Sequence, residues 1–206
     1  DLEILSARFS TNIEHVCQRL TTLNKRTNSG FGLVAGVRQL TIKRSTLNIN
    51  PAQGDLVTTP DSGIGYVAGV SYEMPEIALK VLLTQAPGID IVVPTTVVGS
   101  GTVSQPSFTT LEFETGIANN TLMFGSIHQG EHASAQVKLN GIGAISSFTD
   151  GEKYNIGVGR KFSEKLSGSF SYTTEEGSSA TGTSLLSPTN GTDTYSIGVN
   201  YVTESV

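Results

Sequence analysis

The sequence predicts an all-β protein: an antiparallel barrel that spans a membrane with its strands. Three observations lead to this expectation. Apolar residues alternate with other residues in many short runs, the positions between them carry small residues instead of charges, and short connections alternate with long ones. The composition agrees, because only 15% of the residues are charged and glycine supplies 23 of 206 residues. Such a mixture disfavours helix interiors and suits strands and turns.

Several runs in which apolar residues alternate with other residues predict strands with one apolar face. In chain order they are residues 31–37, 64–72, 77–83, 111–117, 122–124, 154–158, 166–172 and 195–201. The runs at 111–117 and 122–124 follow the alternation less regularly than the others. From these runs and the less regular segments we expect about nine or ten strands.

The face opposite the apolar residues carries mostly Gly, Ser, Asn and Thr. In a soluble β-sandwich this face would meet water and carry Lys, Glu and Arg, whereas small residues suit the lumen of a barrel whose apolar face meets lipid. Tyrosines near strand ends fit the aromatic girdles of membrane barrels, although strands of any β protein are rich in tyrosine. Alternation alone leaves both architectures open. In a membrane barrel, Val70→Arg or Ile156→Arg should be more damaging than Ser71→Arg or Gly157→Ser.

The lengths of the connections favour one of the two architectures. Residues 119–120 and 163–165 form tight turns, and the long connections, rich in Gly, Ser, Thr and Pro, are residues 45–61, 88–106, 129–151 and 175–193. Short turns at one end and long loops at the other are typical of outer-membrane barrels. We therefore expect a membrane barrel, with residues 1–206 forming a single β-barrel domain.

Residues 11–23 allow two interpretations. Apolar side chains recur there at helical spacing, and Thr11 with Glu14 makes a capping box, so the segment read alone predicts a helix. Residues 21–28 contain poor helix formers, which makes a strand interrupted by polar residues the alternative.

Three segments resemble strand pairs of a known family. They are GIGYVAGVSYEMPEIALKVLLT at residues 63–84, LEFETGIANNTLMFGS at 111–126, and YNIGVGRKFSEKLSGSFS at 154–171, which is followed by LSPTNG at 186–191 and the strand from Tyr195. In this order and spacing they look like the FadL/TodX outer-membrane transporters of hydrophobic compounds. Together they cover most of residues 63–203.

The resemblance implies a monomeric, fourteen-stranded antiparallel barrel in the outer membrane of a Gram-negative bacterium, in contact with lipid and lipopolysaccharide. It implies an N-terminal hatch in the lumen and passive uptake of long-chain fatty acids or similar hydrophobic molecules, with no cofactor and no enzymatic activity. Nothing in the chain resembles the hatch, and the final residues 204–206 lack the terminal aromatic residue of such barrels. We therefore expect the chain to be the C-terminal two-thirds of a longer protein, clipped at both ends; a complete chain would have to close a smaller barrel.

A channel needs no catalytic set, because its ligand diffuses and no bond is broken. The candidate functional residues are charged side chains opposite the apolar stripes of their strands, namely Lys80, Glu112 and Glu114. We expect them to line the lumen, where they act on a ligand headgroup, hold a plug or are simply solvated. The segment HQGEH at residues 128–132 matches a zinc pattern, but Gly130 interrupts the helix which that chemistry requires, so we expect a loop there and no metal site.

Other functional classes are excluded or remain as alternatives. The 13 basic and 18 acidic residues argue against a nucleic-acid-binding protein, and no apolar stretch approaches the roughly 18 residues of a transmembrane helix. The single Cys17 excludes an internal disulfide. The alternatives to a transport channel are a structural or adhesive outer-membrane barrel and a soluble, secreted β-sandwich that binds carbohydrate or protein. In the sandwich, residues 64–72 would lie in the core.

Overall fold

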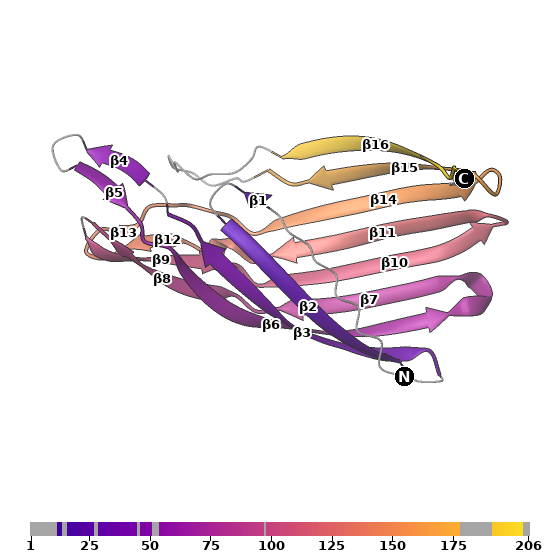
Figure 1. The fold of residues 1–206 in the computed structure, drawn as a ribbon, viewed down its shortest axis with the longest axis horizontal. Helices are drawn as coiled ribbons and strands as arrows, with labels where there is room; N and C mark the ends of the chain where they lie inside the picture. The colour runs from indigo at the N-terminus through magenta and orange to yellow at the C-terminus, as the bar shows by residue number, and fades with distance from the viewer. Residues whose placement is uncertain are drawn as a thin grey trace.

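The computed structural model describes residues 12–13, 16–26, 29–44, 46–50, 54–96, 98–177 and 191–203. Ten antiparallel strands form one large sheet, in which each strand pairs with the next one in chain order (Figure 1). They are β1 (Asn12–Ile13), β2 (Val16–Arg26), β3 (Phe31–Ile42), β6 (Asp61–Met74), β7 (Leu79–Ala86), β10 (Phe108–Ala118), β11 (Thr121–Gly130), β14 (Gly151–Lys161), β15 (Leu166–Glu175) and β16 (Thr192–Tyr201). The all-β architecture and the expected number of strands are confirmed.

The large sheet is curved like part of a barrel wall (Figure 1). Within the described part of the chain the wall is not closed, because β1 pairs only with β2 and β16 pairs only with β15. The described strands therefore form a contiguous section of a barrel.

Short turns join the strands at the end of the wall that lies on the right of Figure 1, as the sequence predicts. Asn119 and Asn120 connect β10 to β11, and Asn120 adopts the left-handed conformation (φ 57°) that asparagine tolerates better than most residues. Residues 162–165 connect β14 to β15, where the Phe162 N–H donates a 2.9 Å hydrogen bond to the Leu166 carbonyl.

One strand begins later than the alternation predicts. Ile77 belongs to the 3-10 helix η1 (Pro75–Ile77), and β7 starts at Leu79. Pro75 has no N–H for the ladder, and Ala78 closes the turn in the left-handed conformation (φ 51°) with its N–H bonded to the Pro75 carbonyl at 3.0 Å. The turn preference of proline thus overrides the apolar alternation at this position.

The long connections at the opposite end are not simple loops, so that part of the expectation is wrong. They contain β4 (Thr46–Asn50), β5 (Gly54–Val57), β8 (Ile89–Thr95), β9 (Gly99–Gln105), the 3-10 helix η2 (His132–Ser134), β12 (Val137–Leu139) and β13 (Gly143–Ala144). Four of these strands form a second sheet in the order β13-β12-β9-β8, and β4 pairs with β5. Ile89, Ile91 and Val93 are buried on alternate positions of β8, a strand pattern that the richness in Gly, Ser, Thr and Pro concealed.

The second sheet packs on one face of the large sheet, which we call the inner face. Ile89 and Ile91 of β8 belong to one apolar cluster with Leu40 and Ile42 of β3. Glycine on β6 makes this approach possible, since a Cβ added at Gly63 would lie 2.5 Å from Cγ2 of Ile89. Residues that pair directly across antiparallel strands share a face, so this contact defines the inner and outer faces of the whole wall.

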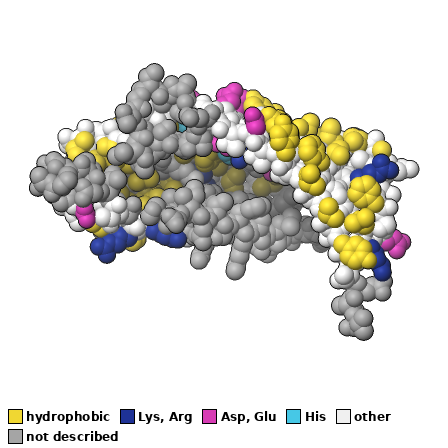
Figure 2. Space-filling model, turned by 90° about the horizontal axis from the view of Figure 1, so that it is seen from above, with side chains coloured by type: hydrophobic (Ala, Val, Ile, Leu, Met, Phe, Trp, Pro, Cys, Tyr) yellow, Lys and Arg dark blue, Asp and Glu magenta, His cyan; other side chains and the backbone are white. Residues whose placement is uncertain are grey.

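The opposite, outer face has no second layer over it in the part of the chain that the structure describes. Its large side chains are apolar and exposed, with 74% of Ile64, 81% of Ile197 and 74% of Val199 accessible. Figure 2 shows hydrophobic side chains gathered on the outside of the wall. The alternative in which residues 64–72 form the core of a sandwich is therefore wrong.

Residues 11–23 contain strands and not a helix. The segments at Asn12–Ile13 and Val16–Arg26 are β1 and β2, whereas Thr11 and Glu14 of the supposed capping box lie outside the described residues. All of β2 pairs with β3, from Val16 opposite Ile42 to Arg26 opposite Gly32. A complete ladder with a neighbouring strand overrides a weak helical preference.

Candidate functional site

Charged residues gather on the inner face of the middle strands. Lys80 on β7 lies opposite Glu114 on β10, and Glu112 lies two positions further along the same face. The next strand, β11, places Phe124 opposite Glu114 and Ser126 opposite Glu112. The register therefore brings together the three residues that the sequence singled out.

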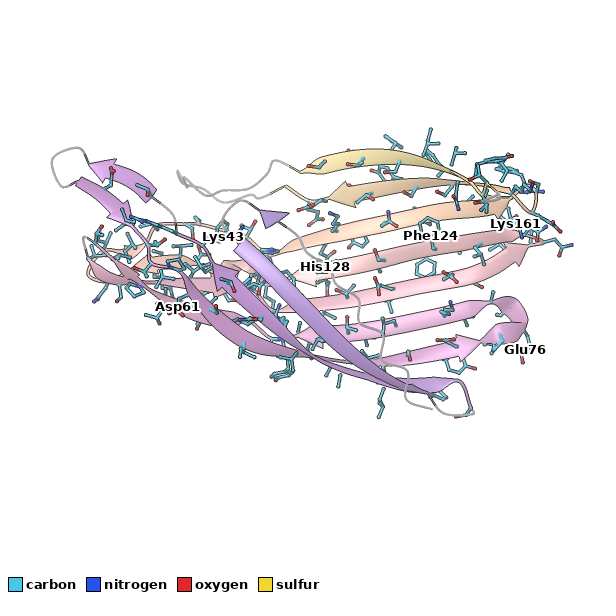
Figure 3. The ribbon with its side chains drawn as sticks, viewed as in Figure 1. Lys43, Asp61, Glu76, Phe124, His128 and Lys161 are labelled. Carbon is cyan, nitrogen blue, oxygen red and sulfur yellow. The ribbon has the colours of Figure 1, made fainter. Side chains whose placement is uncertain are left out.

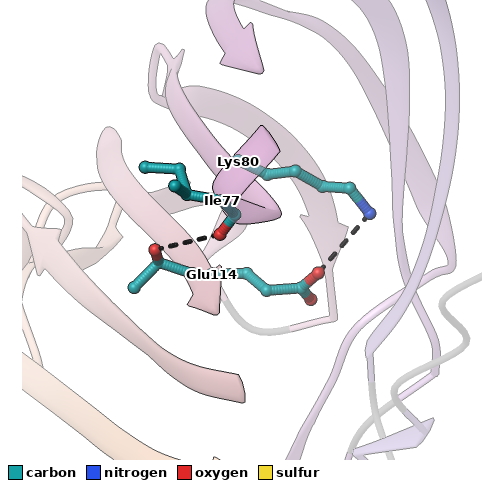
Figure 4. A network of polar contacts seen from close by, with 4 residues as sticks. Ile77, Lys80 and Glu114 are labelled. Carbon is teal, nitrogen blue, oxygen red and sulfur yellow. Dashed lines mark hydrogen bonds and ion pairs between the residues drawn. The ribbon is translucent and has the colours of Figure 1, made fainter. Parts of the chain in front are cut away.

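These residues border a groove of about 380 Å³ whose apolar lining includes Leu82, Phe113 and Phe124. Nζ of Lys80 lies 3.5 Å from Oε1 of Glu114, an ion pair that connects β7 and β10 (Figure 4). The two side chains are 59% and 39% exposed, so the pair adds little to stability. That Lys80, Glu112 and Glu114 act on a ligand stays a prediction.

Carboxylates outnumber cations around this groove. On the side of Lys80 away from Glu114, β6 places Glu73 directly opposite Lys80. Lys80 thus stands between two glutamates in neighbouring strands, and Glu112 adds a carboxylate about 7 Å further along β10. Alternate positions of one strand share a face, so Glu73 lies on the same face as Gly63, which confirms that the groove is on the inner face.

A glycine on the neighbouring strand determines the position of the Phe124 ring. β14 places Gly157 opposite Phe124, and a Cβ added at Gly157 would overlap the ring. Figure 3 shows Phe124 between His128 and Lys161, on the part of the wall towards the short turns. That Gly157→Ser is milder than an outer-face arginine stays a prediction, but the overlap with the ring means that this serine also has a cost.

A second cluster lies nearer the end with the long connections. Arg38 on β3 is 2% exposed, donates a hydrogen bond to the Pro87 carbonyl and lies 5.9 Å from the centroid of the Phe108 ring. The rings of His128 and His132 pack on the same phenylalanine, with centroids at 4.9 and 5.8 Å. The sequence analysis missed Arg38, because nothing local indicates that a second sheet will cover a strand arginine.

The HQGEH segment is the end of a strand followed by a 3-10 turn, and not the loop that we expected. Nδ1 of His128, in β11, lies 2.8 Å from the Thr110 hydroxyl, and Nδ1 of His132, in η2, lies 3.0 Å from the Gly130 carbonyl. Among the described residues, no group of three or more His, Cys, Asp and Glu side chains is placed to hold a metal ion.

Two further hollows lie along the inner face. One of about 230 Å³ adjoins both histidines and an ion pair in which Nζ of Lys153 lies 3.4 Å from Oε2 of Glu175. The other, of about 940 Å³, lies at the short-turn end, where its lining includes small residues such as Gly116, Ser169 and Gly198. Small side chains leave this part of the inner face open.

No helix among the described residues is long and apolar enough to cross a membrane.

No protein-family model and no curated protein sequence matches the chain. Solved structures do match its fold. A Pseudomonas aeruginosa FadL homologue superimposes with a TM-score of 0.67 at 12% identity over 93% of this chain, and the Pseudomonas putida toluene transporter TodX with 0.61 at 11% over 92%. The CymD monoaromatic hydrocarbon channel gives 0.55 at 11% over 92%.

The chain has the fold of a section of these FadL-type β-barrels. It spans 56% of the length of the FadL homologue and 60% of TodX. The likeness at such low identity establishes the architecture alone.

Proposed function

We propose that the protein is an outer-membrane channel through which hydrophobic small molecules diffuse inwards without chemical change. The class includes long-chain fatty acids and hydrocarbons, and the structural neighbours named as hydrocarbon channels support it. The single observation that carries the proposal is the distribution of side chains: large apolar residues are exposed on the outer face, and charged and small polar residues lie inside.

The outer face has the character of a surface solvated by lipid. On β6, the outer residues between Tyr66 and Tyr72 are Ala68 and Val70, whereas Ser62, beyond this apolar stretch, bonds Thr41 of β3 at 3.2 Å. Tyr66 and Tyr72 are about 20 Å apart along the strand, which approaches the roughly 25 Å apolar band of an outer-membrane barrel once neighbouring strands are included. Soluble monomers rarely expose a contiguous apolar surface of this kind.

The inner face is mostly polar and contains a few apolar side chains that a hydrophobic ligand can contact. The groove at Lys80, Glu112 and Glu114 contains Leu82 and Phe124, and the open hollow towards the short turns continues from it along the same face. We propose that Lys80, Glu112 and Glu114 line the lumen. The protein is expected to act as a monomer in contact with outer-membrane lipid and lipopolysaccharide, and to require no cofactor.

Uptake by cells tests this proposal. The complete natural protein would be expressed in a Gram-negative host that lacks its own channel for hydrophobic compounds, and the initial uptake of a radiolabelled hydrocarbon measured. Ser171→Trp places a bulky ring on the inner face, and the matched control Phe170→Trp places one on the outer face. Uptake that depends on the protein and falls only in Ser171→Trp supports the proposal, whereas uptake equal to that of cells without the protein contradicts it.

A further inference from the structure

We infer that the groove at Lys80, Glu112 and Glu114 is a charge filter that favours uncharged hydrophobic molecules over carboxylates of the same size. This inference rests on the proposed channel function and narrows its substrate class. It assigns Glu112 and Glu114 as residues that determine specificity.

The charges that border the groove oppose a carboxylate. Lys80 is the cation of the groove, and its ammonium is already paired with Glu114 at 3.5 Å and lies opposite Glu73 in the register. Glu112 stands on the same face without a cation opposite it, since its direct neighbours are Leu82 and Ser126. An anion entering the groove meets an excess of negative charge, and a neutral molecule does not.

The other inner-face cations, among the side chains that the structure describes, do not compensate for this excess. Lys153 is paired with Glu175 at 3.4 Å, and Arg38 is 2% exposed beneath the second sheet. Lys161 lies at the short-turn end of β14 (Figure 3), about 13 Å along the strand from Gly157, which pairs with Phe124. Among the inner-face side chains that the structure describes, the register thus places no cation other than the paired Lys80 at the level of Phe124.

The apolar part of the groove suits an uncharged molecule, and an aromatic one in particular. Leu82 offers a methyl surface, and the Phe124 ring, which lies over Gly157, offers an aromatic partner. Aromatic pairs gain more than their buried area alone provides. The groove volume of about 380 Å³ accommodates a single aromatic ring with water around it.

The expected discrimination follows from Coulomb's law. For a ligand carboxylate about 7 Å from the Glu112 carboxylate, at an effective dielectric constant of about 40–80, one like charge weakens binding about three- to sevenfold. The effect should shrink at high salt, because exposed charges at this separation are screened within a Debye length of about 3 Å at 1 M salt.

A matched pair of ligands tests the filter. Toluene and benzoate share one ring and differ by a carboxylate, and their binding to the complete protein in lipid nanodiscs would be measured by equilibrium dialysis against empty discs. The variants are Glu112→Gln and Glu114→Gln, and the control is Glu164→Gln, which removes the same charge from the β14–β15 turn. Glu112→Gln should tighten benzoate binding about three- to sevenfold and leave toluene unchanged. Glu114→Gln should tighten it further, because it also releases Lys80.

The outcomes separate the two proposals. Preference for toluene in the wild type, a reduction of that preference by at least about threefold in the two groove variants and no change in Glu164→Gln support the filter. If toluene binds and enters cells but benzoate binds equally well, or if the groove variants leave benzoate binding unchanged, the filter is overturned and the channel stands. If no hydrophobic molecule binds or enters through the protein, the channel function is overturned, and the filter with it.

Discussion

Val70 and Ser71 are neighbours on β6, yet their side chains belong to opposite faces of the wall. Val70 is 51% exposed on the outer face, one residue from the midpoint between Tyr66 and Tyr72. If the outer face meets lipid, this position is close to the middle of the bilayer. Val70→Arg should then cost about 2–4 kcal/mol in the free energy of unfolding, because a guanidinium must be brought into hydrocarbon.

Ser71→Arg is the matched comparison. Ser71 lies on the inner face opposite Leu82 of β7, two positions from Glu73, so a new arginine would extend into a watery lumen next to a carboxylate. We expect a change of about 0.5 kcal/mol or less. Val70→Ala serves as a further control, since it removes the same valine contacts without introducing a charge.

Urea titration of the protein refolded in lipid bilayers measures these free energies, and the mobility of unheated and boiled samples on a gel reports the folded fraction. A cost for Val70→Arg that exceeds that of Ser71→Arg by about 2 kcal/mol or more is the expected result. Equal costs for the two arginines would refute the assignment of the faces, because a sheet covered on both sides would be damaged by either one.

The remaining predictions concern the two faces of the wall, packing and turn geometry. Ile156 is 52% exposed on the outer face, so Ile156→Arg should cost at least about 1 kcal/mol more than Ser171→Arg on the inner face of the neighbouring strand, by the same urea titration. Gly157→Ser should cost about 1–3 kcal/mol by overpacking against the Phe124 ring and the Phe170 carbonyl. A smaller side chain at Phe124 should recover part of this loss in a double-mutant cycle, and no coupling would contradict the packing. Ala78→Gly should raise the free energy of unfolding by about 0.5–1 kcal/mol, because it relieves a left-handed alanine, and a decrease would show that this turn geometry is wrong.

The large sheet could be predicted because its signal is local and repeated. In strands such as β6, β14 and β16, alternate residues meet different surroundings, so the period of two and the unusual face of small residues appear directly in the sequence. The turns at Asn119-Asn120 and at residues 162–165 could be predicted because these segments contain polar residues that favour turns. The same reasoning placed Lys80, Glu112 and Glu114 on one face without knowing which strands are neighbours.

What escaped prediction depends on contacts between distant parts of the chain. β2 reads locally as a helix, and only its ladder with β3 shows the strand. Gly63 and Gly157 appear as unremarkable small residues until Ile89 and Phe124 are seen to lie over them. The burial of Arg38 likewise follows from the second sheet, whose strands are hidden in segments rich in turn-forming residues.

A nitroxide scan along β15 tests most directly whether the outer face of the wall meets lipid and the inner face meets water. With Cys17 replaced by serine, single cysteines at positions 169–173 would be spin-labelled in the complete protein in lipid bilayers, and their collision rates with oxygen and with a water-soluble nickel complex compared. We expect the accessibility of the labels to alternate along the strand. Labels at positions 170 and 172 should collide mainly with oxygen in the lipid, and labels at 169, 171 and 173 mainly with the nickel complex in the lumen. Equal access of the nickel complex to all five positions would contradict it, because both faces of the strand would then be in water.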